Sequence, residues 1–110
     1  MTELEVGKVS INVLQKEVFT SGAVGAFTVS FTFGPEWDDL SKTAVFKAGK
    51  ICRSVPMENG NTVDVPWEVL ENPSSELMVG VCGSNADGVV LPTVLAPLGM
   101  IARGAACGQQ

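Results

Sequence analysis

The chain has 110 residues, enough for one domain with its own core. Only 17% of the residues are charged and 45% are hydrophobic, so polar surface is scarce and we expect a partner to cover part of the molecule; a well-packed monomer with many small surface residues is the alternative. The net charge of −5, with seven scattered Lys and Arg residues, excludes nucleic acid and anionic membranes as partners.

The sequence lacks the residues that catalysis usually requires. It has no histidine, and so lacks the commonest general base and the commonest metal ligand. Ser41 and Lys42 are a poor nucleophile–base pair, because adjacent residues of a strand point to opposite faces. The pair Asp38-Asp39 beside Trp37 is typical of a turn, and there is no phosphate-binding loop. We expect a protein that is not an enzyme and holds no cofactor or metal.

The cysteines form neither a metal-binding nor a disulfide pattern. Cys52, Cys82 and Cys107 are far apart and odd in number. The first two lie in apolar runs, which predicts buried free thiols and a reducing compartment. The segment Met1–Gly7 does not resemble a signal peptide, and no apolar run is long enough to span a membrane. The protein is therefore expected to be made in the cytoplasm and not to be secreted by a signal peptide.

The clearest secondary-structure pattern has a period of two. Between residues 27 and 33 every odd position is apolar, and Thr or Ser stands at the even positions. This alternation predicts a strand that carries Phe27, Val29, Phe31 and Phe33 on one face.

Further strands follow, with turn residues about every 8–12 positions, the spacing of a β-sandwich or barrel. Gly49 indicates a tight turn, Asn59-Gly60 a hairpin, and Asn85–Gly88 a third turn. The predicted strands cover residues 9–13, 43–47, 51–55, 63–65, 77–81, 89–94 and 98–102.

Two segments interrupt this pattern, and each carries one tryptophan. Pro35–Leu40 follows the strongest strand, and Pro66–Leu70 predicts one short helical turn near residues 66–71. We expect Trp37 and Trp67 to fold over the open ends of the sheets rather than to stack on a ligand.

The chain is interpreted as a single domain over residues 1–103. Residues 104–110 are small and polar, and are expected to be a flexible C-terminal tail or the start of a linker.

Motifs over nearly the whole chain resemble one family. They are Leu14–Val24, Val29–Phe33, Glu36–Leu40, Lys42–Phe46, Val65–Leu70, Val79–Val81 with Gly83, Val90–Thr93, Leu98-Gly99 and Gly104-Ala105. The chain resembles the small N-terminal domains of tail-fibre, baseplate (baseplate upper protein-like) and minor structural proteins of phages and prophages of Firmicutes. It departs from them at Asp39, where the family has glycine, and at Cys82, where it has an aromatic residue; both changes affect packing more than fold.

The resemblance implies an all-β fold, an immunoglobulin-like antiparallel β-sandwich of about 7–8 strands. It implies a virion structural protein, assembled in the bacterial cytoplasm, that anchors a fibre or adsorption device to the baseplate or tail. Its partners would be other virion proteins of the baseplate, tail or capsid, and further copies of the chain in a homo-oligomer such as a trimer. A capsid decoration or head-fibre protein is one alternative. A carbohydrate- or host-binding module is another, and would need exposed tryptophans.

Under this interpretation the characteristic residues act by packing. The core and its end caps are predicted to contain Phe27, Phe31, Phe33, Trp37, Phe46, Trp67 and Leu70. Exposed sheet edges or loops would bind the neighbouring subunit, and pairing of an edge strand with a partner is a natural hypothesis.

Overall fold

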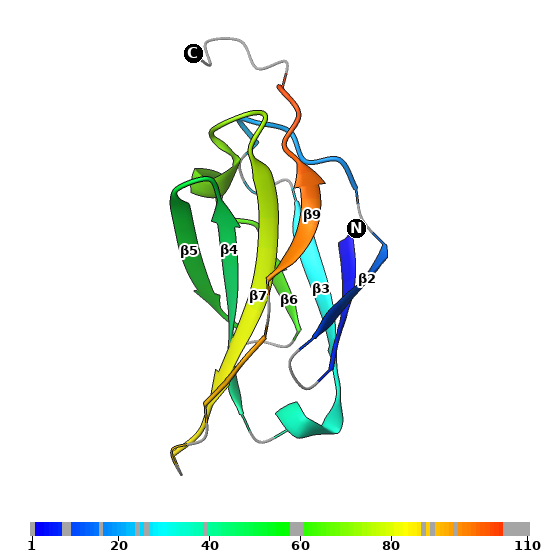
Figure 1. The fold of residues 1–110 in the computed structure, drawn as a ribbon, viewed down its shortest axis with the longest axis vertical. Helices are drawn as coiled ribbons and strands as arrows, with labels where there is room; N and C mark the ends of the chain where they lie inside the picture. Colours follow the sequence, from blue (N-terminus) through cyan, green and yellow to red (C-terminus); the bar gives the residue numbers. More distant parts are fainter. Residues whose placement is uncertain are drawn as a thin grey trace.

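In the computed structural model, the chain forms two β-sheets that pack face to face (Figure 1). The structure describes residues 2–7, 10–15, 17–23, 25, 27–38, 40–57, 61–86, 88, 90–93 and 95–104. The elements are β1 (Thr2–Val6), β2 (Ile11–Gln15), β3 (Thr28–Phe33), the 3-10 helix η1 (Pro35–Trp37), β4 (Ser41–Ala48), β5 (Ile51–Pro56), β6 (Thr62–Asp64), the 3-10 helix η2 (Trp67–Leu70), β7 (Glu76–Ser84), β8 (Val90–Pro92) and β9 (Ala96–Met100).

The first sheet has the strand order β2-β1-β3-β6, and the second has β5-β4-β7 with β8 and β9 beyond β7. All pairs are antiparallel except β1 with β3, which is parallel. β9 pairs with the first half of β7 and β8 with its last three residues, so the two short strands share one edge. The predicted all-β sandwich is confirmed, and the expected turn near residues 66–71 is η2.

The sequence patterns missed one strand of this fold, β1. Its five residues alternate strictly: Thr2, Leu4 and Val6 are buried, while Glu3 and Glu5 are exposed. This alternation is a local property of residues 2–6 and is visible in the sequence. Including β1, the described residues form nine strands rather than about 7–8.

The prediction of a hairpin at Asn59-Gly60 is wrong. Its turn residues lie outside the described part of the chain, but the strands on either side, β5 and β6, belong to different sheets. β5 pairs with β4, whereas β6 pairs with β3. Burial explains the difference, because Val63 and Val65 reach the core from the opposite sheet. Between β5 and β6 the chain therefore passes from the second sheet to the first.

Burial along β3 follows the predicted alternation. Val29 and Phe31 are buried, and Phe27 and Phe33 pack partly buried against the core. Phe27 meets Phe19 edge-on, with ring centroids 5.0 Å apart. From the second sheet, Phe46 completes this layer with no exposed surface. The alternation of β3 therefore defines one wall of the core.

Trp37 closes one end of the sandwich. Its side chain is fully buried, and its Nε1–H donates to the carbonyl oxygen of Gly7 at 2.7 Å. Its ring lies 5.5 Å from that of Phe33 and against Gly83 of β7. A Cβ atom at Gly83 would stand 2.7 Å from Trp37 Cζ3 and 3.0 Å from Leu40 Cδ1. Glycine at position 83 is therefore required for the two sheets to close around the indole ring.

We predict that Gly83→Ala destabilises the domain by about 1–3 kcal/mol, because the added methyl group overpacks the contact with Trp37. Urea unfolding followed by circular dichroism measures the effect. Ser84→Ala, at the exposed next position of β7, is the control and should change the stability by less than about 0.5 kcal/mol. Equal stability of Gly83→Ala and the wild type would contradict the described contact.

Candidate docking surfaces

The described residues contain no group of three or more His, Cys, Asp or Glu side chains placed to hold a metal ion. None of their helices has the length and apolar character required to cross a membrane. Cys82 is half-buried, but Cys52 is exposed, so the expectation of a buried thiol there is wrong. The reason is that Cys52 pairs with the exposed Lys47 of β4, so its side chain is on the outer face of the sheet. Cys107 lies outside the described residues.

The outer edge of β5 can be derived from its hydrogen bonds. In an antiparallel pair, residues whose backbone groups face the partner alternate with residues whose groups face away. The N–H of Met57 donates to the carbonyl oxygen of Lys42 on the β4 side at 3.0 Å. By alternation, the backbone groups of Cys52, Ser54 and Pro56 face away from β4.

At two of these three residues, one outward backbone group cannot pair with an incoming strand. Pro56 has no N–H to offer to an incoming strand. The carbonyl oxygen of Cys52 accepts a hydrogen bond from Arg53 Nη1 at 2.9 Å. Of these three residues, only Ser54 offers both an outward N–H and an outward carbonyl oxygen. β5 is therefore poorly suited to pairing with another strand.

Prolines occupy the corresponding positions on the opposite edge of the same sheet. The N–H of Thr93 donates to the carbonyl oxygen of Val81, so the backbone of Pro92 faces outward from β8. Since Val81 faces β8, alternation along β7 directs the backbone groups of Met78 toward β4. The backbone of Pro97, which pairs with Met78, therefore faces outward from β9. Three of the six prolines in the chain thus stand at outward positions of edge strands in one sheet.

The edges of the other sheet are also interrupted. β6 has only three residues. β2 pairs with β1 through a shifted register between Glu3 and Leu4, and β9 approaches β2 from the second sheet. Short strands, bulges and prolines are the usual protections against edge-to-edge association. The geometry therefore favours docking through side chains over the edge pairing expected from the sequence.

Trp67 is the largest exposed hydrophobic side chain among the described residues. The sequence predicts Trp67 in the core or as a cap over its end, but 49% of its surface is exposed, so it is not a buried residue. Val69 and Leu70 are the buried residues of η2, and they leave the first residue of this short helix on the outside. Glu68, next in the chain, lies 3.8 Å from Arg53 of β5, oxygen to nitrogen. Leu70 is buried as predicted.

Trp67, Arg53 and Glu68, which we call the Trp67 surface, combine features common at binding sites. Tryptophan and arginine are enriched among the residues that dominate binding energies at protein interfaces. The ion pair is partly exposed, so it adds little stability. A short helix held by two buried side chains presents the indole in a fixed place, which lowers the entropy lost on binding.

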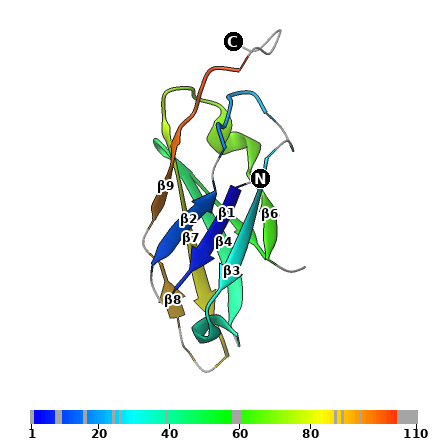
Figure 2. The ribbon, with the colours of Figure 1, turned by 90° about the vertical axis from the view of Figure 1, so that its right-hand side faces the viewer.

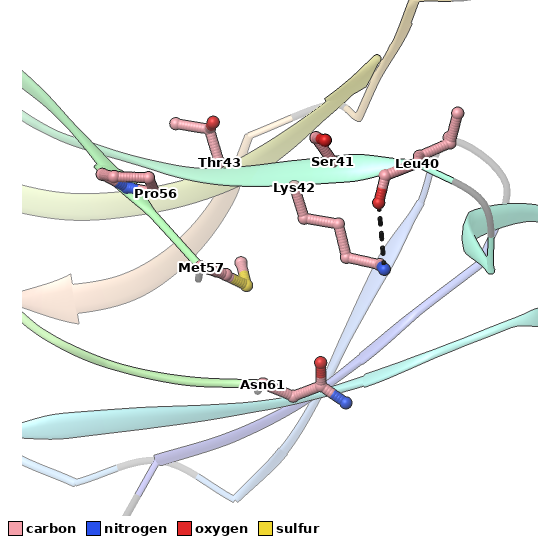
Figure 3. A pocket seen from close by; sticks show the side chains of 7 residues that line it. All are labelled: Leu40, Ser41, Lys42, Thr43, Pro56, Met57 and Asn61. Carbon is pink, nitrogen blue, oxygen red and sulfur yellow. Dashed lines mark hydrogen bonds between the residues drawn. The ribbon is translucent and has the colours of Figure 1, made fainter. Parts of the chain in front are cut away.

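A second candidate is a pocket of about 530 Å³ beside the start of β4 and the end of β5 (Figure 3). Lys42 and Met57 extend into it toward Asn61, which precedes β6. The ammonium group of Lys42 donates to the carbonyl oxygen of Leu40 at 3.2 Å and lies 5.2 Å from the centre of the Phe33 ring. The cation is thus already engaged by the protein, which makes this pocket the weaker candidate.

Comparison with known proteins returned nothing: no family model, no curated protein and no solved structure matches the chain. The resemblance to phage structural domains therefore remains a prediction from the motifs.

Quenching of tryptophan fluorescence by acrylamide tests the two indole environments. We predict two components in the wild type, one protected and blue-shifted from Trp37 and one accessible from Trp67. Trp67→Phe should remove the accessible component and leave the blue-shifted emission. A wild-type protein with both tryptophans protected, or a variant whose quenching is unchanged, would contradict the exposure of Trp67.

Proposed function

We propose that this chain is a virion structural domain: an adaptor β-sandwich that docks a fibre or adsorption device to the baseplate or tail of a phage. The motif resemblance supports this role. Trp67 carries the docking part of the proposal, because it is half-exposed on a short helix whose next residue, Glu68, pairs with Arg53, in a fold whose strand edges are protected. The adaptor would therefore bind its neighbour in the virion through the Trp67 surface.

Other structural roles in a virion are alternatives to this one. A capsid decoration or head-fibre protein would use the same surface on a different part of the particle. In each case the chain acts by binding and not by catalysis.

A carbohydrate- or host-binding module is the second candidate function. The exposed indole of Trp67 favours it, because an aromatic ring next to charged side chains can pack on the apolar face of a sugar while Arg53 and Glu68 bond its hydroxyl groups. A glycan array followed by calorimetry with the best glycan separates this function from the first. Binding that Trp67→Ala abolishes would favour the carbohydrate module.

Mass spectrometry of density-purified phage particles tests the virion assignment. Particles induced from the bacterium that carries the gene should contain peptides of this chain at a fixed ratio to a known capsid or tail protein. Their absence from intact particles would rule out the proposal.

Incorporation of variants then tests the docking surface. Trp67→Ala should reduce incorporation at least tenfold, a typical loss for a central interface tryptophan. Ser54→Pro is the matched control on the neighbouring edge of β5: its N–H faces outward, so the change should cost less than about 1 kcal/mol of stability and leave incorporation intact. Loss of incorporation by a folded Ser54→Pro variant, with Trp67→Ala normal, would instead identify edge pairing as the mode of attachment.

A further inference from the structure

The pocket of about 530 Å³ at the start of β4, which we call the Lys42 pocket, is lined by residues from both sheets. Residues 40–43, 56 and 57, at the start of β4 and the end of β5, line one side of it. Asn61 lines the other side and directly precedes β6, the edge strand at the right of the first sheet in Figure 2. Small-molecule sites have volumes of ~300–1,000 Å³. The Trp67 surface is better suited to a protein partner, but a pocket of this size suits a small ligand.

Backbone hydrogen bonds hold the residues of this pocket in place. The side chains of Lys42, Met57 and Asn61 extend into it (Figure 3). The N–H of Met57 donates to the carbonyl oxygen of Lys42 at 3.0 Å, and the carbonyl oxygen of Asn61 accepts from the N–H of Phe31 at 2.8 Å. The pocket is therefore preformed by the two sheets, and a ligand can enter it without ordering new backbone.

The ammonium group of Lys42 is held in position but is not neutralised. It donates to the carbonyl oxygen of Leu40 at 3.2 Å and lies 5.2 Å from the centre of the Phe33 ring. An ammonium group has three N–H donors, so the contact with Leu40 leaves two of them for a ligand. Within the part of the chain that the structure describes, no carboxylate forms an ion pair with Lys42.

The local charge of the Lys42 pocket favours an anion. Lys42 is the only charged residue among the described residues that line it. Glu58 follows Met57 in the chain and lies outside the described residues. Lys42 is half-buried, and a charge that is partly removed from water attracts an opposite charge more strongly than a fully solvated one. We therefore expect an anionic ligand here, although the whole chain carries −5.

The other lining side chains indicate what the anionic group is attached to. Asn61 is exposed, and the N–H groups of its side-chain amide can donate to an anionic oxygen atom. Met57 packs partly buried against the core and supplies apolar surface, and methionine adapts to ligands of irregular shape. Pro56 adds further apolar surface beside it. One anionic head group joined to a small apolar body matches this combination.

We propose that the Lys42 pocket binds a small organic acid. The carboxylate of the acid accepts hydrogen bonds from the ammonium group of Lys42 and from the amide of Asn61, and its apolar body packs on Met57. The aromatic ring of Phe33 and the carbonyl oxygen of Leu40 keep the ammonium group oriented for this contact. This inference does not depend on the proposed virion role.

Proton–nitrogen correlation NMR of the full chain tests the inference by titration with three probes. These are hexanoate, its neutral analogue hexanamide, and phosphate, an anion without an apolar body. Hexanoate should shift the backbone amide signals of Lys42, Met57 and Asn61 in a saturable manner. Hexanamide lacks the charge and phosphate lacks the apolar contact with Met57, so each should bind at least about tenfold more weakly than hexanoate.

Lys42→Met removes the charge and should weaken hexanoate binding at least about tenfold. Lys47→Met is the matched control, because Lys47 lies on the same strand with its exposed side chain on the outer face, away from the pocket. It should bind hexanoate like the wild type. Asn61→Ala, which should weaken binding about threefold or more, provides a second test should Lys42→Met fail to fold, as judged by circular dichroism. A wild type without saturable shifts at the pocket, equal binding of hexanoate and hexanamide, or equal weakening by Lys47→Met would overturn the inference.

Discussion

The contact between Trp37 and Gly83 connects parts of the chain that are far apart in sequence. The indole follows β3, donates to the carbonyl oxygen of Gly7 after β1, and packs on β7 of the opposite sheet. A buried indole needs both a hydrogen-bond acceptor and a flat space for its ring. The backbone turn at Gly7 supplies the first, and a residue without Cβ supplies the second. One side chain thereby fixes how the two sheets meet at this end.

The other end of the sandwich is fixed by backbone hydrogen bonds. Ile101 pairs with Ser75 on one side, and Ala102 with residues 19–21 on the other. Gly104 donates to Ser21 Oγ, and its Cα lies so close to the backbone of Ser21 that a Cβ would collide with the carbonyl group. Residues 101–104 thus join the last strand to the segment between β2 and β3. The described chain is tied into the fold up to this point.

The strand edges of this fold are protected against pairing with another strand. The prolines at positions 56, 92 and 97 remove outward N–H groups from one sheet, and bulges or short strands interrupt the other. The half-exposed Trp67 is carried by the short helix η2, next to β5.

The sequence by itself determined the class of fold and most of the strands, because alternation with period two is a local property. It also identified Trp37, Phe31, Phe46 and Leu70 as buried. It could not assign the strands to sheets: the Asn-Gly segment looked like a hairpin, and only burial of Val63 from the opposite side made it a crossing. Nor could it distinguish the two tryptophans, both placed after a proline in a loop. Trp37 meets a glycine of a distant strand and is buried, whereas Trp67 begins a helix whose later residues fill the core. Tertiary packing decides which indole is enclosed by the core, and it leaves Trp67 half-exposed at the surface.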